Sequence, residues 1–410
     1  MDHENRESGR RHGKDIATQA DIRALLIQCK HELPAMLHCL RQAVEIESPT
    51  HCKPAVDRLA RFFGREFQRL GARVRLLPHP TAGSAVIAEF SRRRAASAPL
   101  HCKPLLVLGH LDTVWDVGTL RRMPFRIARG RAYGPGILDM KSGLVCGLWA
   151  MAALKATGLV PFVPVRFFLN TDEETGSHAF RREMEQEARR AQAVLVLEPA
   201  AEGGALKTSR KGVGEFQITV RGRSAHAGIN PQAGVNAIVE LAGQILRLQK
   251  FAQAHPGLTL NVGIIEGGTR VNVVPELAGA RLEVRIPRRR DARLVEHQLR
   301  ALKPIHPEAR LEITGGINRP PLERSMSAAL WQQTRRLGRV LGMELKEAST
   351  GGGSDGNFTA ALGVPTLDGL GGVGDGAHAR NEHVIIAELP RRAALLAALL
   401  AGLGRHPSGK

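Results

Sequence analysis

The strongest constraint on the fold is a continuous apolar run at residues 104–108, which leads directly into the motif GHLDTVW at residues 109–115. Such a run is typical of a strand that is buried on both faces of a parallel sheet. Side chains two apart on a strand share a face, so His110 and Asp112 are expected to project together from its carboxyl end. In open α/β sheets that end is where ligands bind. An imidazole beside a carboxylate is also how proteins orient a metal ligand.

Strands alternate with helices on both sides of this run, which predicts an α/β domain with a mixed, mostly parallel sheet. One helix is expected over residues 22–46. Near residue 208 the pattern changes, and residues 214–221 (GEFQITVR) alternate apolar and polar side chains as a half-exposed strand does. The elements that follow have the order βαββαβ, which predicts an inserted α+β domain of the ferredoxin-like type. We therefore expect a disordered tail (1–15), an inserted domain (209–320) and a main domain in two parts (16–208 and 321–410).

The composition narrows the range of partners. The formal net charge is +19, but basic residues are spread along the whole chain and only 4% of residues are aromatic. Without stacking platforms or a DNA-binding motif we expect no specific nucleic-acid partner, although the positive field can attract anionic substrates. The longest apolar run, residues 393–401, is too short to span a bilayer, so no membrane partner is expected. The first 15 residues contain no apolar signal segment, which favours a cytoplasmic location.

Four further acid or imidazole clusters could complete a metal site with His110. Asp139 lies in a glycine-rich loop (GPGILDMKSG) before a helix, where one carboxylate can bridge two cations. Glu198 ends a strand, and His378 lies in the glycine-rich loop GDGAHARNE. Together with the motif TDEETGS at residues 171–177, they supply nitrogen and oxygen ligands of the kind that zinc prefers.

Glu173 and Glu174 are adjacent in TDEETGS and must point in different directions. This arrangement suits two roles, with one carboxylate on a metal and the other available for proton transfer. The complete set has two imidazoles, three ligand carboxylates and one carboxylate to spare, which indicates two zinc ions that share an aspartate and a water. Co²⁺ and Mn²⁺ stay open as alternatives, because carboxylate-rich sites accept several divalent ions.

These motifs in this order resemble the dizinc hydrolase family that contains glutamate carboxypeptidases, aminoacylases and succinyl-diaminopimelate desuccinylases. The resemblance covers nearly the whole chain after the tail, and it is greatest to bacterial glutamate carboxypeptidases, the folate-hydrolysing branch. It implies that His110 and Glu198 hold one zinc, that Glu174 and His378 hold the other, and that Asp139 bridges them.

The resemblance also assigns residues that act beside the metals. It implies that Asp112 orients His110 and that Glu173 is the general base. It further implies a cis peptide bond between Asp139 and Met140. The main domain would be the catalytic domain, and residues 209–320 would form a lid and dimerisation domain that makes the protein a homodimer.

Four residues outside the metal motifs are implied to bind substrate. His226 would reach the active site of the partner subunit and stabilise the oxyanion. Asn272 and Arg319 would bind the free carboxylate of the substrate, and Gly353 would offer a backbone N–H to the same end. Arginine suits this task because its guanidinium can pair with a carboxylate through two hydrogen bonds.

The resulting hypothesis is a zinc-dependent exopeptidase that releases a C-terminal amino acid with a free carboxylate, often glutamate, from a small peptide or N-acyl amino acid. Folate-type substrates are included. The alternative within enzymes is an N-acyl-amino-acid deacylase or desuccinylase that uses the same dizinc site. The alternative from a different class is a non-catalytic protein whose positive surface binds nucleic acid. Loss of a catalytic residue would indicate it, and none is missing from the family pattern.

Overall fold

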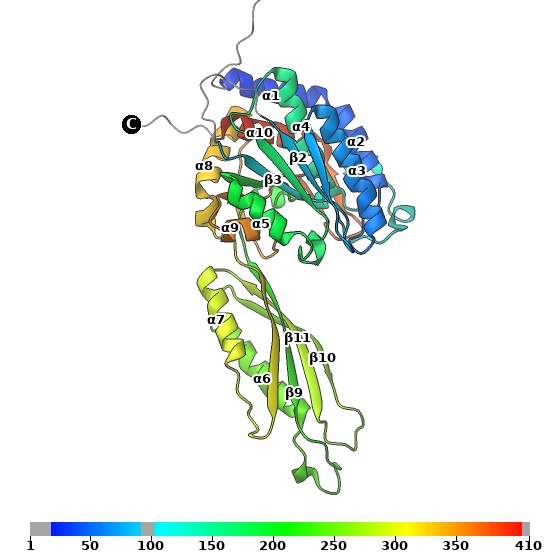
Figure 1. The fold of residues 1–410 in the computed structure, drawn as a ribbon, viewed down its shortest axis with the longest axis vertical. Coiled ribbons are helices and arrows are strands. Elements are labelled where there is room, and N and C mark those ends of the chain that lie inside the picture. Colours follow the sequence, from blue (N-terminus) through cyan, green and yellow to red (C-terminus); the bar gives the residue numbers. More distant parts are fainter. Residues whose placement is uncertain (1–17, 92–101, 404–410) are drawn as a thin grey trace, which may run out of the picture. The chain divides into compact units, whose positions relative to one another are not determined.

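The computed structural model describes residues 18–91 and 102–403, so the tail expected at residues 1–15 lies outside the described residues. The chain divides into two compact units (Figure 1). Unit 1 comprises the described residues of Met1–Ala205, Leu330–Lys346 and Asp368–Lys410. Unit 2 comprises Leu206–Ala329 and Glu347–Leu367.

Unit 2 thus contains a second segment beyond the insertion expected at residues 209–320. It belongs there because β13 (Glu347–Thr350) pairs in parallel with β8 (Leu206–Arg210). The pairing joins residues about 140 positions apart through a strand of only four residues. A strand this short leaves no local pattern that would reveal its partner.

Unit 1 is built on a mixed sheet in which the strands have the order β1-β2-β6-β3-β7. The central strand β3 pairs in parallel with both β6 and β7, whereas β2 pairs antiparallel with β1 and β6. Every residue of β3 is buried, as its continuous apolar run predicts. The predicted α/β fold is confirmed. The strands are β1 (Arg73–Leu77), β2 (Ala85–Phe90), β3 (Leu105–His110), β6 (Val165–Asn170) and β7 (Ala193–Val196).

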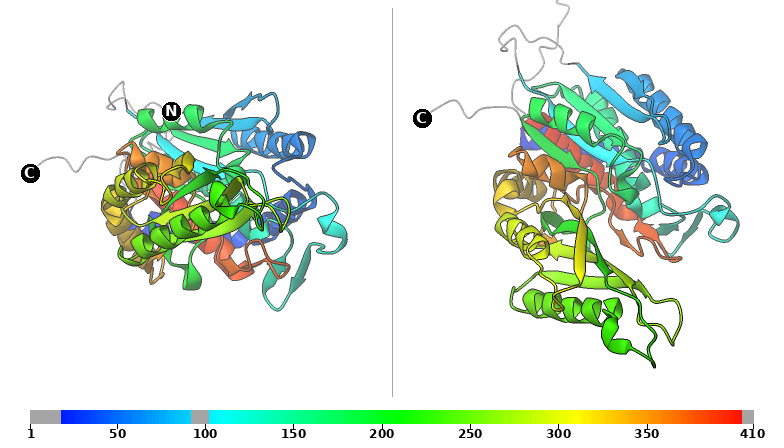
Figure 2. Two further views of the ribbon diagram at one scale, coloured as in Figure 1. Left: turned by 90° about the horizontal axis from the view of Figure 1, so that it is seen from below. Right: turned by 60° about the horizontal axis from the view of Figure 1, so that its bottom comes forward.

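Two crossover helices connect the parallel strands, and they cover opposite faces of the sheet (Figures 1 and 2). Helix α4 (Ser142–Thr157) leads from β3 to β6, and helix α5 (Arg181–Arg190) leads from β6 across β3 to β7. Because parallel crossovers are right-handed, connections that run in opposite directions along the sheet place their helices on opposite faces. Because β3, β6 and β7 are parallel, their carboxyl ends lie at the same edge of the sheet. The connections that leave this edge run to opposite faces of the sheet.

Helix α4 lies in the core of unit 1. The segment Ile137–Thr157 is long and apolar enough in composition to cross a membrane, but 83% of its most apolar window is buried inside the fold. It packs against α1 (Gln19–His31) and α10 (Leu389–Gly402). Its apolar character is therefore accounted for by packing within unit 1.

The single helix expected over residues 22–46 is wrong, because the structure has two helices there. The first, α1, ends at His31, and α2 (Leu33–Glu45) begins one residue after Glu32. Pro34 lies in the first turn of α2, where its missing N–H costs nothing, but in a continuous helix its ring would clash with the preceding turn. The next helix, α3 (Lys53–Leu70), packs on β1 and β2.

A second, smaller sheet in unit 1 brings two distant loops together. Its strands have the order β15-β16-β5-β4, and β16 pairs antiparallel with both β15 and β5. The loop after β5 carries Asp139, and the loop between β15 and β16 carries His378. The strands are β4 (Arg126–Ala128), β5 (Arg131–Tyr133), β15 (Gly374–Asp375) and β16 (His383–Ile385).

Unit 2 contains an antiparallel sheet in the order β10-β11-β9-β12, with α6 and α7 packed on its apolar face. The chain order βαββαβ and this strand order confirm the predicted ferredoxin-like fold. The elements are β9 (Gly212–Arg221), α6 (Ala237–Gln253), β10 (Thr259–Gly267), β11 (Leu277–Ile286), α7 (Arg289–Arg300) and β12 (Arg310–Arg319). Unit 2 also contains α9 (Asp355–Ala361) and β14 (Thr366–Leu367), and the boundary between the units at Leu330 falls within α8 (Arg324–Val340).

We predict that Gly143→Ala destabilises unit 1. A Cβ added at Gly143 would overlap the backbone carbonyl of Leu197, the residue before Glu198. Alanine improves helix propensity by about 1 kcal/mol, but displacing main chain in a packed core costs about 1–3 kcal/mol. The overlap should dominate, so Tm measured by calorimetry should fall. Gly351→Ala is the control, because no atom lies within 4 Å of its added Cβ. A Tm for Gly143→Ala equal to that of the control would contradict this prediction.

Candidate metal centre

Three candidate ligand segments follow adjacent strands of the unit 1 sheet. His110 is the last residue of β3, Glu173 and Glu174 lie in the short helix η3 (Glu173–Thr175) after β6, and Glu198 follows β7. Ligand atoms of His110, Glu173 and Glu198 lie within 4.8 Å of one another, as do those of a second group that contains His110, Asp139 and Glu174. Parallel pairing of the three strands is what brings these side chains to one place.

Asp139 lies between the two imidazoles and presents one oxygen to each. Its Oδ1 is 3.1 Å from Nε2 of His110, and its Oδ2 is 3.5 Å from Nε2 of His378. Nε2 of His378 is also 3.3 Å from Oε2 of Glu174, and Nε2 of His110 is 3.6 Å from Oε1 of Glu198. The Asp139–Met140 peptide bond is cis, as the resemblance implies. The site thus has two halves that share one aspartate.

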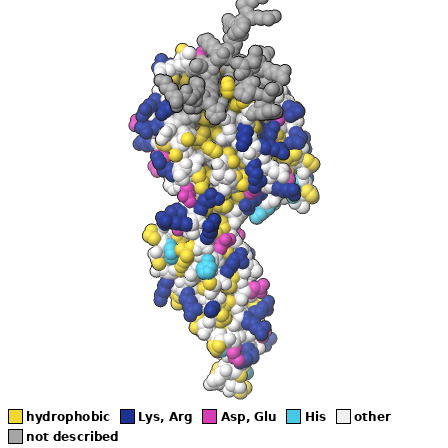
Figure 3. Space-filling view, turned by 60° about the vertical axis from the view of Figure 1, so that its left-hand side comes forward, with side chains coloured by type: hydrophobic (Ala, Val, Ile, Leu, Met, Phe, Trp, Pro, Cys, Tyr) yellow, Lys and Arg dark blue, Asp and Glu magenta, His cyan; other side chains and the backbone are white. Residues whose placement is uncertain are grey.

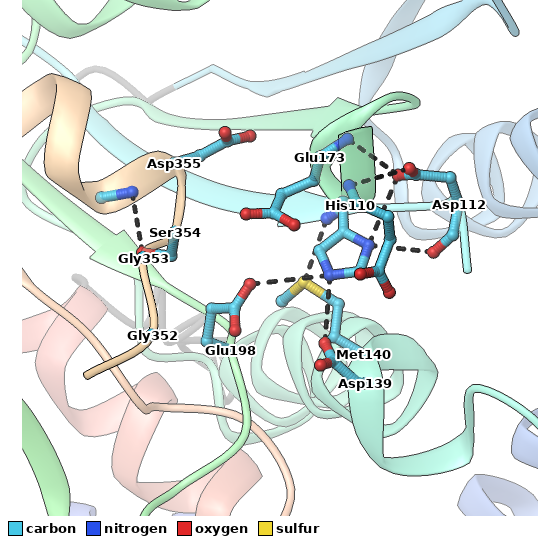
Figure 4. A network of polar contacts seen from close by, with 12 residues as sticks. His110, Asp112, Asp139, Met140, Glu173, Glu198, Gly352, Gly353, Ser354 and Asp355 are labelled. Atoms are coloured by element: carbon cyan, nitrogen blue, oxygen red, sulfur yellow. Dashed lines mark hydrogen bonds and ion pairs between the residues drawn. The ribbon is translucent and has the colours of Figure 1, made fainter. Parts of the chain in front are cut away.

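His110 is oriented by Asp112 from the opposite side of the ring (Figure 4). Nδ1 of His110 lies 3.0 Å from the backbone oxygen of Asp112 and 3.4 Å from its Oδ1. Both atoms are acceptors, so Nδ1 carries a proton, while Nε2 faces the carboxylates of Asp139 and Glu198. Burial by itself lowers the pKa of His110, but hydrogen bonds to Asp112 and Asp139 outweigh it and raise the pKa well above its usual value.

Asp112 does more than orient His110, and the sequence did not reveal this. Its Oδ1 accepts the backbone N–H of Glu173 at 3.2 Å, and its Oδ2 accepts the backbone N–H of Glu174 at 3.1 Å. Oδ2 also accepts the Thr50 hydroxyl at 2.8 Å. Burial raises the pKa of Asp112, but its bonds to His110 and Thr50 lower it overall, so it is held as a carboxylate. One buried carboxylate therefore fixes ligands that come from two strands.

The residues fit divalent metal ions. Oε1 of Glu174 is buried and has no hydrogen-bond partner, and burial is the main cause that raises the pKa of this carboxyl group. Hydrogen bonds to Asp139 and Glu174 raise the pKa of His378 to about 10. A buried oxygen without a donor, in a cluster where carboxylates outnumber imidazoles, is a ligand set that cations would stabilise.

His226 and Asn272 lie together in unit 2, apart in sequence but adjacent in structure. His226 forms an isolated bridge with Val273, and the backbone N–H of Ala227 donates to the Asn272 carbonyl. Nδ1 of His226 accepts two backbone N–H groups, from Gly228 and Ile229, both at 3.1 Å. Nδ1 is thus an acceptor, so the neutral ring carries its proton on Nε2. The His226 side chain is exposed.

Arg319 and Gly353 also belong to unit 2, and they pack against each other. A Cβ added at Gly353 would lie 2.9 Å from Cδ of Arg319. Arg319 is 8% exposed, its guanidinium is 3.5 Å from Oδ1 of Asp355, and it lies over the ring of Phe358. The sequence did not reveal Asp355 as its partner. Arg210 donates to the carbonyl oxygens of Gly352 and Gly353 at 3.2 and 3.1 Å, which holds this loop in place.

Sequence reasoning missed two residues that touch the metal-ligand segments, Thr50 and Glu382. The hydroxyl of Thr50 reaches Asp112 from 62 positions away in the sequence. Glu382 accepts backbone N–H groups that lie up to 246 positions away. Neither residue lies at ligand spacing in a motif. The only available signal for Glu382 was an acidic side chain four residues after His378.

We predict that Asp112→Asn weakens metal binding. The amide cannot accept at both positions where Asp112 now receives N–H and O–H donors. Loss of such an outer partner typically lowers metal affinity by about 10–100-fold, and competition with a chelator would measure it. Thr50→Val is the graded control, because it removes one donor and leaves the N–H bonds of Glu173 and Glu174 intact. Equal affinity of Asp112→Asn and the parent would refute the role given to Asp112.

Comparison with known proteins shows which family this chain belongs to. Residues 106–402 match the family described as Peptidase family M20/M25/M40. The chain is 31% identical to carboxypeptidase G2 of a Pseudomonas species over 91% of this chain and 90% of that protein. It is 27% identical to a succinyl-diaminopimelate desuccinylase of Rhodopseudomonas palustris, over 84% and 91% of the two chains.

Solved structures share the fold. The aminopeptidase PepT from Bacillus cereus superposes with a TM-score of 0.73 at 20% identity, covering 91% of this chain and 99% of that one. An M20 family metallo-carboxypeptidase from Sulfolobus solfataricus superposes with a TM-score of 0.67 at 18% identity, covering 90% and 99%. The family match and the 31% identity over nine-tenths of both chains show that this chain belongs to the M20/M25/M40 peptidase family and is a metal-dependent hydrolase.

Proposed function

We propose that this enzyme is a dizinc carboxypeptidase that hydrolyses an amide bond and releases a C-terminal amino acid with a free carboxylate. Glutamate is the proposed product, and folate-type compounds are among the proposed substrates. The observation that carries the proposal is Asp139, which presents one oxygen to His110 and the other to His378. The 31% identity to carboxypeptidase G2 supports the carboxypeptidase branch over others in the family.

In this proposal His110 and Glu198 hold one zinc, Glu174 and His378 hold the other, and Asp139 serves both. Two such ions would lower the pKa of a water molecule and polarise the carbonyl group of the substrate. The ligands come from three strand ends and two loops of unit 1, so their positions are set by the sheet.

Glu173 is the proposed general base. Its backbone N–H is held by Asp112, and its carboxylate lies within 4.8 Å of the ligand atoms of His110 and Glu198. Because Glu174 would hold a zinc together with His378, the adjacent Glu173 would accept the proton of the attacking water. It would then deliver that proton to the leaving amine.

Residues of unit 2 are proposed to bind the substrate. The proton on Nε2 of His226 makes this exposed ring a donor for the oxyanion, an interaction typically worth about 3–4 kcal/mol when preorganised. Arg319, Asn272 and Gly353 are proposed to bind the carboxylate of the released amino acid. Asp355 and Phe358 hold the guanidinium of Arg319 in a fixed orientation, which reduces the entropy lost when it pairs with a carboxylate.

We also propose that unit 2 is a lid and dimerisation domain, and that a second copy of this chain covers its exposed edge. β10 is an edge strand, and the adjacent helix α6 contacts it. Large apolar side chains are exposed on both elements, including Leu246 and Val239 of α6 and Ile265 of β10. An unprotected apolar edge is a template for pairing with another chain, and a two-fold dimer would cover both copies at once. His226 would then act in the site of the partner subunit.

We predict that the zinc-loaded protein releases glutamate from folate or N-acyl-glutamates, detected by amino-acid analysis of the products. Glu173→Gln should lower kcat by about 10²–10⁴-fold, because the proton acceptor is lost. Its zinc content should stay close to that of the parent, since Glu174 and Glu198 are unchanged. Zinc content measured on the same samples is the control for structural damage.

Two outcomes would contradict this assignment. Near-parental turnover by zinc-bound Glu173→Gln would remove Glu173 as the base. Hydrolysis of N-succinyl-diaminopimelate or simple N-acyl amino acids in preference to glutamate conjugates would favour the deacylase or desuccinylase, an alternative that the 27% identity to a desuccinylase supports. Parallel loading with Co²⁺ and Mn²⁺ would identify the most active metal.

We predict that Leu246→Glu converts a dimeric parent into monomers, as measured by sedimentation. Leu246 is 64% exposed, so the substitution should change the free energy of unfolding by no more than about 0.5 kcal/mol. Ile127→Glu is the matched control, because this apolar side chain of β4 in unit 1 is 55% exposed and should leave the dimer intact. A parent protein that sediments as a monomer would refute the proposed interface.

A further inference from the structure

Glu382 is a buried carboxylate to which the proposed reaction assigns no task. It is fully buried, with 0% of its surface exposed, in the segment between His378 and β16. Its Oε1 accepts the backbone N–H groups of Leu138 and Asp139, at 2.9 and 3.1 Å. Its Oε2 accepts the backbone N–H of Gly136 at 2.9 Å and the indole N–H of Trp115 at 2.8 Å. Both oxygens are therefore committed to N–H donors and are not available as metal ligands.

These four donors and their acceptor belong to three different segments that carry candidate metal ligands. Trp115 lies in the motif GHLDTVW, which contains His110, and Gly136 and Leu138 lie in the loop of Asp139. Glu382 itself follows His378 by four residues. One side chain thus connects the loops that present both imidazoles and the shared aspartate.

The charge of Glu382 is balanced within unit 1. The Lys141 ammonium, which is 1% exposed, interacts electrostatically with Glu382 and Glu47 and donates to the backbone oxygen of Ile46 at 3.0 Å. Four N–H donors and a nearby ammonium offset much of the cost of burying a carboxylate. A neutral acceptor such as an amide could close a loop without the free-energy cost of burying a charge. The presence of a carboxylate here therefore points to a further role.

We infer that Glu382 is a positioning residue that sets the distance between Asp139 and the two imidazoles, and thereby the affinity of the site for both metal ions. The inference rests on the metal binding proposed above. Backbone N–H groups of the Asp139 loop have fixed directions, so a buried acceptor that binds three of them defines where the Asp139 carboxylate lies. Outer partners of metal ligands commonly act in this way.

The test compares Glu382→Gln with a matched control in the full-length protein. In Glu382→Gln the amide NH₂ must face two N–H donors whichever way it is oriented, so two hydrogen bonds are lost. Glu240→Gln is the control, because Glu240 is 4% exposed and accepts the backbone N–H groups of Ile305 and His306 and the side chain of Gln244. Glu240 lies in unit 2, whereas every candidate metal ligand belongs to unit 1.

The readouts are Co²⁺ affinity and the visible absorption spectrum of bound Co²⁺, together with Tm of the metal-free protein. We expect the two variants to lose similar amounts of Tm. Glu382→Gln should bind Co²⁺ at least about tenfold more weakly than the parent and with an altered spectrum, whereas Glu240→Gln should match the parent in both. Parental affinity and spectrum in Glu382→Gln would overturn the inference, and so would equal losses of affinity in both variants.

If Glu382→Gln does not fold, Trp115→Phe decides the question, since it removes one donor and leaves the three backbone bonds. Reduced Co²⁺ affinity would then support the inference, and unchanged affinity would overturn it. The readouts involve no substrate, so a parent that binds two ions but releases no glutamate would refute the proposed substrate alone. A parent that binds no divalent ion would overturn both.

Discussion

The site depends first on the parallel pairing of β3 with β6 and β7. This pairing places His110, the Glu173–Glu174 pair and Glu198 at the same edge of one sheet, although they span about 90 residues of sequence. Crossover helices on opposite faces leave that edge open between them. Any change that shifts the register of β3 would move an imidazole away from two carboxylates at once.

Buried carboxylates then fix the positions of the ligand segments at this edge of the sheet. Asp112 accepts N–H groups from the backbone of Glu173 and Glu174, and Glu382 accepts them from the loop of Asp139. Backbone donors are rigid compared with side chains, so a buried acceptor fixes the loop that carries a ligand as well as the ligand itself. In both proposals, a carboxylate whose oxygens accept N–H groups positions the carboxylates that would hold the metals.

The proposed function also separates binding of the metals from recognition of the substrate. All the proposed ligands belong to unit 1, whereas His226, Asn272, Arg319 and Gly353 belong to unit 2. The residues proposed to bind substrate have partners within unit 2, such as Asp355 for Arg319 and backbone N–H groups for His226. On the face shown in Figure 3, basic side chains are spread over both units, as they are along the sequence.

The sequence by itself determined the strand and helix periods, the βαββαβ insertion and the ligand candidates, because each is written in a local pattern such as the run before His110. It failed at Pro34, where a helical pattern hid a break between two helices. Only the tertiary structure decided that β13 joins unit 2, that Thr50 and Glu382 contact the ligand segments, and that Asp355 pairs with Arg319. These contacts join residues far apart in the chain through single hydrogen bonds or ion pairs, which impose no periodicity on the sequence.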